Sequence, residues 1–77
     1  MTQGEWKEIF GGNLVTLLKE RNMSRSELAK KTGLSTSRIS DYINGYAAPS
    51  IFAAINMAYV LDLDVGEFID FEEPVTY

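Results

Sequence analysis

Two helix-start signals lie close together near the middle of the chain, and this spacing limits how it can fold. Ser24 with Glu27 fits a capping box, and Ser35 fits the N-cap of a second helix. Only Gly33-Leu34 lie between the end of the first helix and that second cap. Gly33 suits the left-handed conformation in which helices often end. Two short helices joined so closely must cross steeply and pack on each other. The spacing therefore predicts a crossed helix pair.

Three further helices are predicted, which makes an all-α fold of five. The first covers about residues 3–22. Gly11-Gly12 weaken it, so this segment forms either one helix or two shorter pieces. The others are an apolar helix over residues 51–61 and a last short helix, "VGEFI". We expect the second of the crossed helices to stop at Asn44-Gly45. The remaining predicted caps are a Thr2–Glu5 box, Ser50 and an Asp64–Glu67 box.

Length and composition favour a single small domain that spans residues 1–77. They also provide few side chains suited to catalysis. The 77 residues include no cysteine and no histidine, which excludes disulfides, thiolate nucleophiles and the usual nitrogen or sulfur metal sites. The acidic side chains after residue 60 lack a nucleophile–base pair or a phosphate-binding loop nearby. We therefore expect no enzyme, no catalytic residue, no cofactor and no metal. The N-terminus lacks a signal-peptide pattern and no segment is apolar enough to span a membrane, so we expect a cytoplasmic protein.

Charge is unevenly distributed along the chain. The net charge of −4 argues against nucleic acid, whose phosphates require Lys and Arg. However, residues 24–48 contain four basic and two acidic side chains, whereas residues 49–77 contain six acidic side chains and no basic one. The middle third can therefore face a polyanion while the last third faces away. Chance segregation in a short chain is the alternative.

The second helix of the pair has a polar arc opposite an apolar one. At about 100° per residue, Ile39, Tyr42 and Ile43 share the apolar side. Small hydrogen-bonding groups beside the basic Arg25 suit a helix that reads base edges in the major groove. For each hydroxyl, local capping or simple solvation is the alternative interpretation. The polar arc consists of Thr36, Ser37, Ser40, Asp41 and Asn44.

The same stretch resembles a known family. The residues that match are Arg25, Leu28-Ala29, Gly33-Leu34, Ile39, Tyr42 and Gly45, and the likeness extends over residues 10–69. Their spacing is similar to that of the Cro/C1-type (XRE) helix-turn-helix family of phage-like transcriptional regulators. The resemblance implies a five-helix, lambda-repressor-like DNA-binding domain with a helical extension over residues 1–9 and an acidic tail over 70–77.

The resemblance also implies a function and its residues. It indicates a sequence-specific, dimeric, repressor-like regulator whose recognition helix, residues 36–44, enters the major groove of an operator. By position in the family, Thr36, Ser37 and Asp41 contact bases, and Ser40 and Asn44 lie on the same arc. The candidate phosphate contacts are Arg25, Arg38, Lys30, Lys31 and Tyr46.

The chain departs from the family in ways that keep a second function open. The family often buries an arginine with a glutamate where this chain has Leu18 and Ile43, which we expect to touch in the core. The connector "YAAP" lacks the basic residues common there. A protein-binding regulator such as an antirepressor, whose partner is another regulator, is therefore the alternative function. Surplus apolar residues form either a protein interface or an enlarged core: Trp6, Val15, Phe52, Tyr59 and Phe71.

Overall fold

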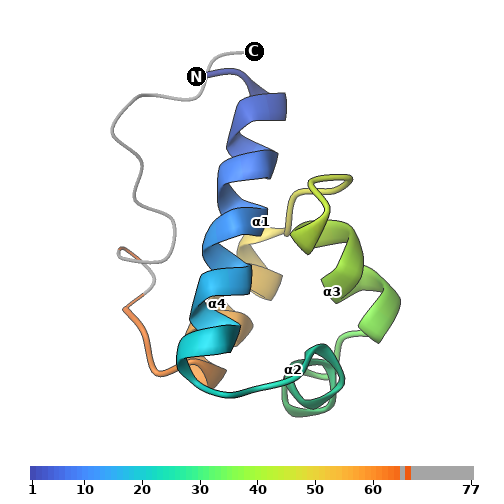
Figure 1. The fold of residues 1–77 in the computed structure, drawn as a ribbon, viewed down its shortest axis with the longest axis vertical. Helices are drawn as coiled ribbons and strands as arrows, with labels where there is room; N and C mark the ends of the chain where they lie inside the picture. Colours follow the sequence, from blue (N-terminus) through green and yellow to red (C-terminus); the bar gives the residue numbers. More distant parts are fainter. Residues whose placement is uncertain (65, 67–77) are drawn as a thin grey trace.

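The computed structural model describes residues 1–64 and residue 66 and contains four helices within them. They are α1 (Gln3–Glu20), α2 (Arg25–Thr32), α3 (Thr36–Ile43) and α4 (Ile51–Val60), and Figure 1 shows α4 behind α1 with α2 and α3 beside them. The predicted all-α class is confirmed. The fifth predicted helix, "VGEFI", and the tail 70–77 lie outside the described residues. None of the helices in the described part has the length and hydropathy to cross a bilayer.

A side-chain hydroxyl caps the start of each of the four helices, as predicted. The box at Thr2 is complete, because its hydroxyl accepts the Glu5 N–H at 3.2 Å and the Glu5 carboxylate accepts from the Thr2 backbone. The second box is half formed: Ser24 accepts the Glu27 N–H, but the Glu27 carboxylate lies 3.2 Å from the Lys31 ammonium. The hydroxyls therefore fix where helices begin. The remaining caps are Ser35 and Ser50.

The helix α1 runs unbroken through Gly11-Gly12, so of the two alternatives the single helix is the one that forms. Gly11 is buried where α1 crosses the end of α3, and a Cβ built on it would lie 2.5 Å from the carbonyl oxygen of Ile43. A Cβ on Gly12 would meet nothing within 4 Å. Gly11 is thus required for the close approach of two backbones, not for a break in the helix.

The core is apolar and draws on all four helices. α3 packs on both α1 and α2, and α4 packs on α2. Trp6 is half-buried and stacks on Phe10 with ring centroids 5.4 Å apart, so this part of the N-terminal extension enlarges the core. Ile39 and Tyr42 point from α3 into the core, which leaves the opposite side of α3 facing outward. The buried apolar residues are Phe10, Leu14, Leu18, Leu28, Ala29, Ile39, Tyr42, Ala53, Ala54, Met57, Ala58 and Leu61.

Candidate nucleic-acid interface

The connection between α2 and α3 is short and held by hydrogen bonds. Gly33 has a φ of 79°, a left-handed conformation that glycine adopts without a steric penalty, and its N–H donates to the Ala29 carbonyl at 2.9 Å. The Thr32 hydroxyl donates to the Leu28 carbonyl at 2.8 Å and accepts the Leu34 N–H at 3.3 Å. The turn therefore sets one orientation of α3 relative to α2.

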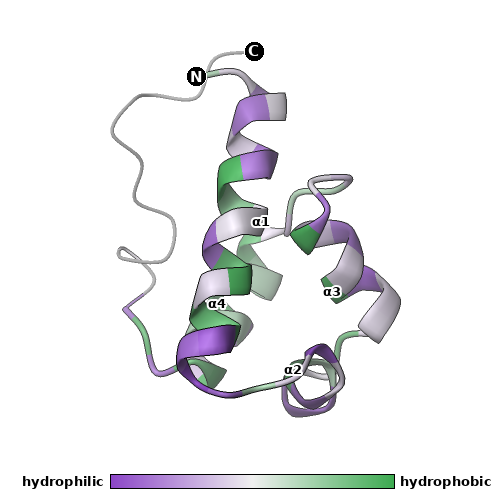
Figure 2. Cartoon of the chain, in the orientation of Figure 1, coloured by the Kyte–Doolittle hydropathy of each residue, from purple (hydrophilic) through white to green (hydrophobic). Residues whose placement is uncertain are grey.

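The outward side of α3 gathers the polar residues that the sequence pattern placed on one arc. Ile39 and Tyr42 are only 0% and 3% exposed on the opposite side. Ser40 is partly buried, whereas the other members of the arc are exposed. Figure 2 shows purple and pale turns with some green along α3, and a mixture of purple, pale and green turns along α1. The exposed members are Thr36, Ser37, Asp41 and Asn44, and Arg38 is exposed beside them.

Arg25 at the start of α2 connects the two helices. Its guanidinium donates to the Ser40 hydroxyl at 3.3 Å across the helix crossing. The Ser40 hydroxyl is neutral and does not cancel the positive charge of Arg25, and the Arg25 side chain is exposed, so an exposed positive charge lies beside α3. Ser40 already accepts this bond, and it is less available to a base edge than Ser37 is.

The other predicted phosphate contacts differ in their surroundings. Arg38 and Lys30 are exposed, and Tyr46 is 75% exposed just beyond α3. Lys31 forms an i,i+4 ion pair with Glu27, which reduces its local charge. Lys30 and Lys31 also lie in the last turn of α2, where a cation stabilises the helix dipole, so their charge has a structural use as well.

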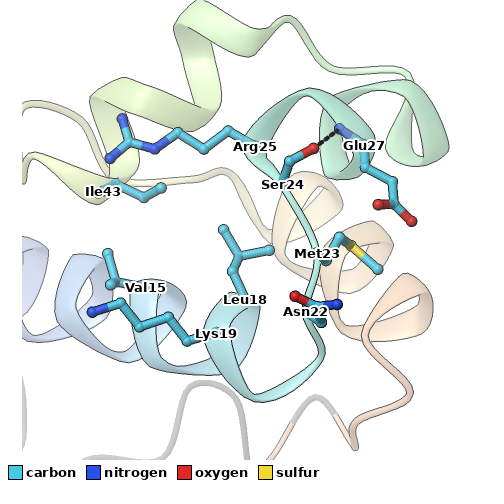
Figure 3. A pocket seen from close by; sticks show the side chains of 9 residues that line it. All are labelled: Val15, Leu18, Lys19, Asn22, Met23, Ser24, Arg25, Glu27 and Ile43. Carbon is cyan, nitrogen blue, oxygen red and sulfur yellow. Dashed lines mark hydrogen bonds between the residues drawn. The ribbon is translucent and has the colours of Figure 1, made fainter.

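A pocket of about 500 Å³ opens between the end of α1, the start of α2 and the end of α3, and the sequence pattern did not predict it. Leu18 and Ile43 both line it, so the two positions that differ from the family face one shared space (Figure 3). Lys19 and Arg25 bring positive charge to its lining. In the sequence, the only feature that pointed to this pocket was the replacement of both family residues by the aliphatic Leu18 and Ile43. Val15, a candidate interface residue, is half-buried and lines the same pocket.

The other candidate interface residues differ clearly in how exposed they are. Phe52 and Tyr59 are 71% and 86% exposed on α4, and Phe71 lies outside the described residues. Trp6 is half-buried against the core. Arg21, a cation at the end of α1, is not directed to α3, because its Nε donates to the Leu61 carbonyl at 2.6 Å. The exposed aromatic residues of α4 therefore form a second surface, distinct from the polar arc.

Acidic side chains do not gather into a candidate metal site in the described part of the chain. There, no three His, Cys, Asp or Glu side chains lie close enough to hold a metal ion. The pKa of Glu5 is lowered because its carboxylate accepts hydrogen bonds from the Thr2 hydroxyl and backbone N–H. This shift belongs to a helix cap, far along α1 from the start of α2.

Comparison with known families agrees with this geometry. The sequence matches the model of a family described as helix-turn-helix over residues 14–68, and that family is the Cro/C1 (XRE) type. The match includes the whole of α2, α3 and α4 and the connections between them. No curated protein matches the chain significantly.

Proposed function

This chain belongs to the Cro/C1-type helix-turn-helix family, and from that premise we propose that it is a sequence-specific, repressor-like regulator that binds operator DNA. The observation that supports this most is the outward polar arc of α3 beside the uncompensated guanidinium of Arg25. A helix of this width fits the major groove of B-form DNA, where each base pair presents a distinct hydrogen-bonding pattern. We further propose that the protein acts in the cytoplasm of its host, belongs to a phage or mobile element and binds its operator as a homodimer.

In the proposed complex, residues 36–44 lie in the major groove. Thr36 and Ser37 donate to or accept from base edges, and Asp41 accepts from the amine of a cytosine. Asn44 reaches bases at the far end of the helix. Phosphates lie against Arg25 and Arg38, with Lys30, Lys31 and Tyr46 further out, and these contacts set the register without reading sequence.

The experiment separates the two kinds of contact. Preferred duplexes are selected from random DNA, and affinity for the best duplex and a scrambled duplex is measured at several salt concentrations. Arg25→Ala should weaken both complexes alike and reduce the salt slope by about one unit. Ser37→Ala should cost about 1–3 kcal/mol on the selected duplex and little on the scrambled one.

Asp41→Asn is the sharpest single change, because it keeps the shape and removes a charge that repels phosphate. Its amide can also pair with adenine, so we expect higher affinity overall and a changed preference at one base position. An unchanged selected sequence, together with equal salt slopes for Arg25→Ala and the parent, would contradict the proposed reading helix.

A protein-binding regulator such as an antirepressor is the second candidate. The observations that favour it are the exposed Phe52 and Tyr59 and the net charge of −4. On this alternative the partner is another regulator protein, and no duplex is bound even at low salt. Both candidates act by binding and not by catalysis, and neither requires a cofactor, a metal or a membrane.

A further inference from the structure

The pocket between the ends of α1 and α3 is kept open by the helix crossing beside it. At Gly11 the two backbones already touch, since a Cβ there would lie 2.5 Å from the Ile43 carbonyl oxygen. Val15, about one helical turn further along α1, is the first residue of that helix to line the pocket. The two helices cannot move closer to fill the space, so the pocket of about 500 Å³ is a fixed feature of the fold.

The lining of this pocket combines hydrocarbon with positive charge. Val15, Leu18 and Ile43 provide aliphatic surface, whereas Lys19 and Arg25 are exposed cations. In Figure 3 the two cationic side chains extend on opposite sides of Val15 and Ile43, and both charged ends lie toward the same side of the view. A molecule that fills the pocket therefore meets hydrocarbon along its body and positive charge at one end.

Among residues 1–64 and 66, neither of these two cations has a carboxylate partner. Arg25 donates to the neutral Ser40 hydroxyl. Glu27 is the acidic residue of the lining, but its carboxylate lies 3.2 Å from the Lys31 ammonium, and Figure 3 shows it directed away from Arg25. The pocket therefore has a positive charge that an anionic ligand would neutralise.

We propose that this pocket binds a small apolar carboxylate. Its hydrocarbon or aromatic body lies against Val15, Leu18 and Ile43, and its carboxylate lies between Lys19 and Arg25. Pockets of about 300–1,000 Å³ with a largely apolar lining and a few polar groups are typical of small-molecule sites. A guanidinium can hold a carboxylate through two parallel N–H···O bonds, and an ammonium adds a point charge.

Arg25 gives this site a regulatory consequence, and that consequence rests on the proposed function. The same guanidinium is the proposed phosphate contact beside α3, so the carboxylate and a DNA phosphate compete for it. Each ligand then weakens binding of the other by the same factor. The small molecule would act as an inducer that releases the operator.

Titration of the full chain with 2-naphthoate, followed by NMR in the absence of DNA, tests the site itself. We expect saturable binding with a Kd on the order of 100 μM and amide shifts centred on Leu18, Lys19 and Ile43. 2-Naphthamide has the same rings without the charge and should bind at least about fivefold more weakly. No saturable binding, equal binding of the amide, or shifts centred on the exposed Phe52 and Tyr59 of α4 would overturn the proposal.

Lys19→Gln tests the cation that has no part in the proposed DNA contacts. It should weaken binding of 2-naphthoate about threefold and leave binding of 2-naphthamide unchanged. Lys7→Gln is the matched control, because Lys7 lies on the same helix about 18 Å from Lys19 and does not line the pocket. Circular dichroism should show that both variants remain helical. Equal weakening by the two variants would overturn the assignment of the carboxylate position.

Competition with DNA at constant ionic strength tests the regulatory part. Saturating 2-naphthoate should weaken binding of the selected duplex about fivefold or more, and 2-naphthamide should leave it unchanged. An unchanged duplex affinity with 2-naphthoate bound would overturn the inducer role. A protein that binds 2-naphthoate but no duplex contradicts the proposed function alone, and one that binds a duplex but not 2-naphthoate contradicts the ligand site alone.

Discussion

Replacing Gly11 with alanine should destabilise the protein, against the usual effect of this change in a helix. In an exposed helix interior, alanine is favoured over glycine by about 1 kcal/mol. Here the new Cβ would lie 2.5 Å from the Ile43 carbonyl oxygen and 2.6 Å from that of Tyr42. Non-bonded contacts to carbon normally stay near 3.5 Å, so α1 and α3 would have to separate by about 1 Å.

The expected magnitude follows from these distances. Overpacking a core typically costs about 1–3 kcal/mol, and the upper end applies because both opposing atoms belong to the backbone and cannot rotate away. After the gain in helix propensity, the free energy of unfolding should fall by about 2 kcal/mol. For a domain of this size that corresponds to a melting temperature lower by roughly 8–16 °C.

Thermal and urea denaturation followed by far-ultraviolet circular dichroism measure the change. Gly12→Ala is the matched control, because it is the next residue of α1 and its Cβ would meet nothing within 4 Å. It should raise the free energy of unfolding by about 0.5–1 kcal/mol. If Gly11→Ala were as stable as Gly12→Ala, the close approach of α1 to α3 would be refuted.

Three other changes have defined outcomes. Asp62→Gly should add about 0.5–1 kcal/mol of stability, because Asp62 has a φ of 56° and a negative charge just past the end of α4; an unchanged melting temperature would argue against strain there. Ile43→Glu should destabilise by about 1–3 kcal/mol, because its carboxylate would meet Leu18 in the pocket, and denaturation of the double variant with Leu18→Arg should show partial recovery. Thr2→Ala should raise the pKa of Glu5 part of the way toward its ordinary value, as seen by NMR titration, because it removes the hydroxyl that contributes most to the lowering and keeps the backbone N–H. The stability from Glu5 is present above the ordinary carboxyl pKa and lost as pH falls through the lowered one, so this acid dependence should become weaker in Thr2→Ala.

Structural features that depend only on residues close together in the sequence could be predicted from it. Ser35 and Ser50 cap helices because a hydroxyl and an N–H three residues later are always within reach of each other. Gly33 ends α2 because its left-handed φ is favoured by its own lack of a side chain. The polar arc of α3 followed from helical periodicity alone, since Ile39 and Tyr42 mark the buried side without ambiguity.

Features set by packing between distant segments were not predictable in the same way. Gly11 reads as a weak point in a helix, and only the position of Ile43 shows why no side chain fits there. Apart from Asn56, every residue of α4 is apolar or aromatic, so periodicity alone does not predict that Met57 is buried and Tyr59 exposed. The hydrogen bond from Arg25 to Ser40 depends on the crossing of α2 and α3.

If α3 reads DNA as proposed, the bonded turn between α2 and α3 has a consequence for the kinetics of binding. Thr32 and Gly33 hold that turn through backbone carbonyls, and Arg25 ties the start of α2 to the middle of α3. The conformational entropy of orienting α3 is therefore lost during folding and not during binding. A surface ordered in advance meets every duplex in the same shape, so encounter rates should differ little between sequences. Discrimination among operators should then appear as residence time, with the preferred duplex released most slowly.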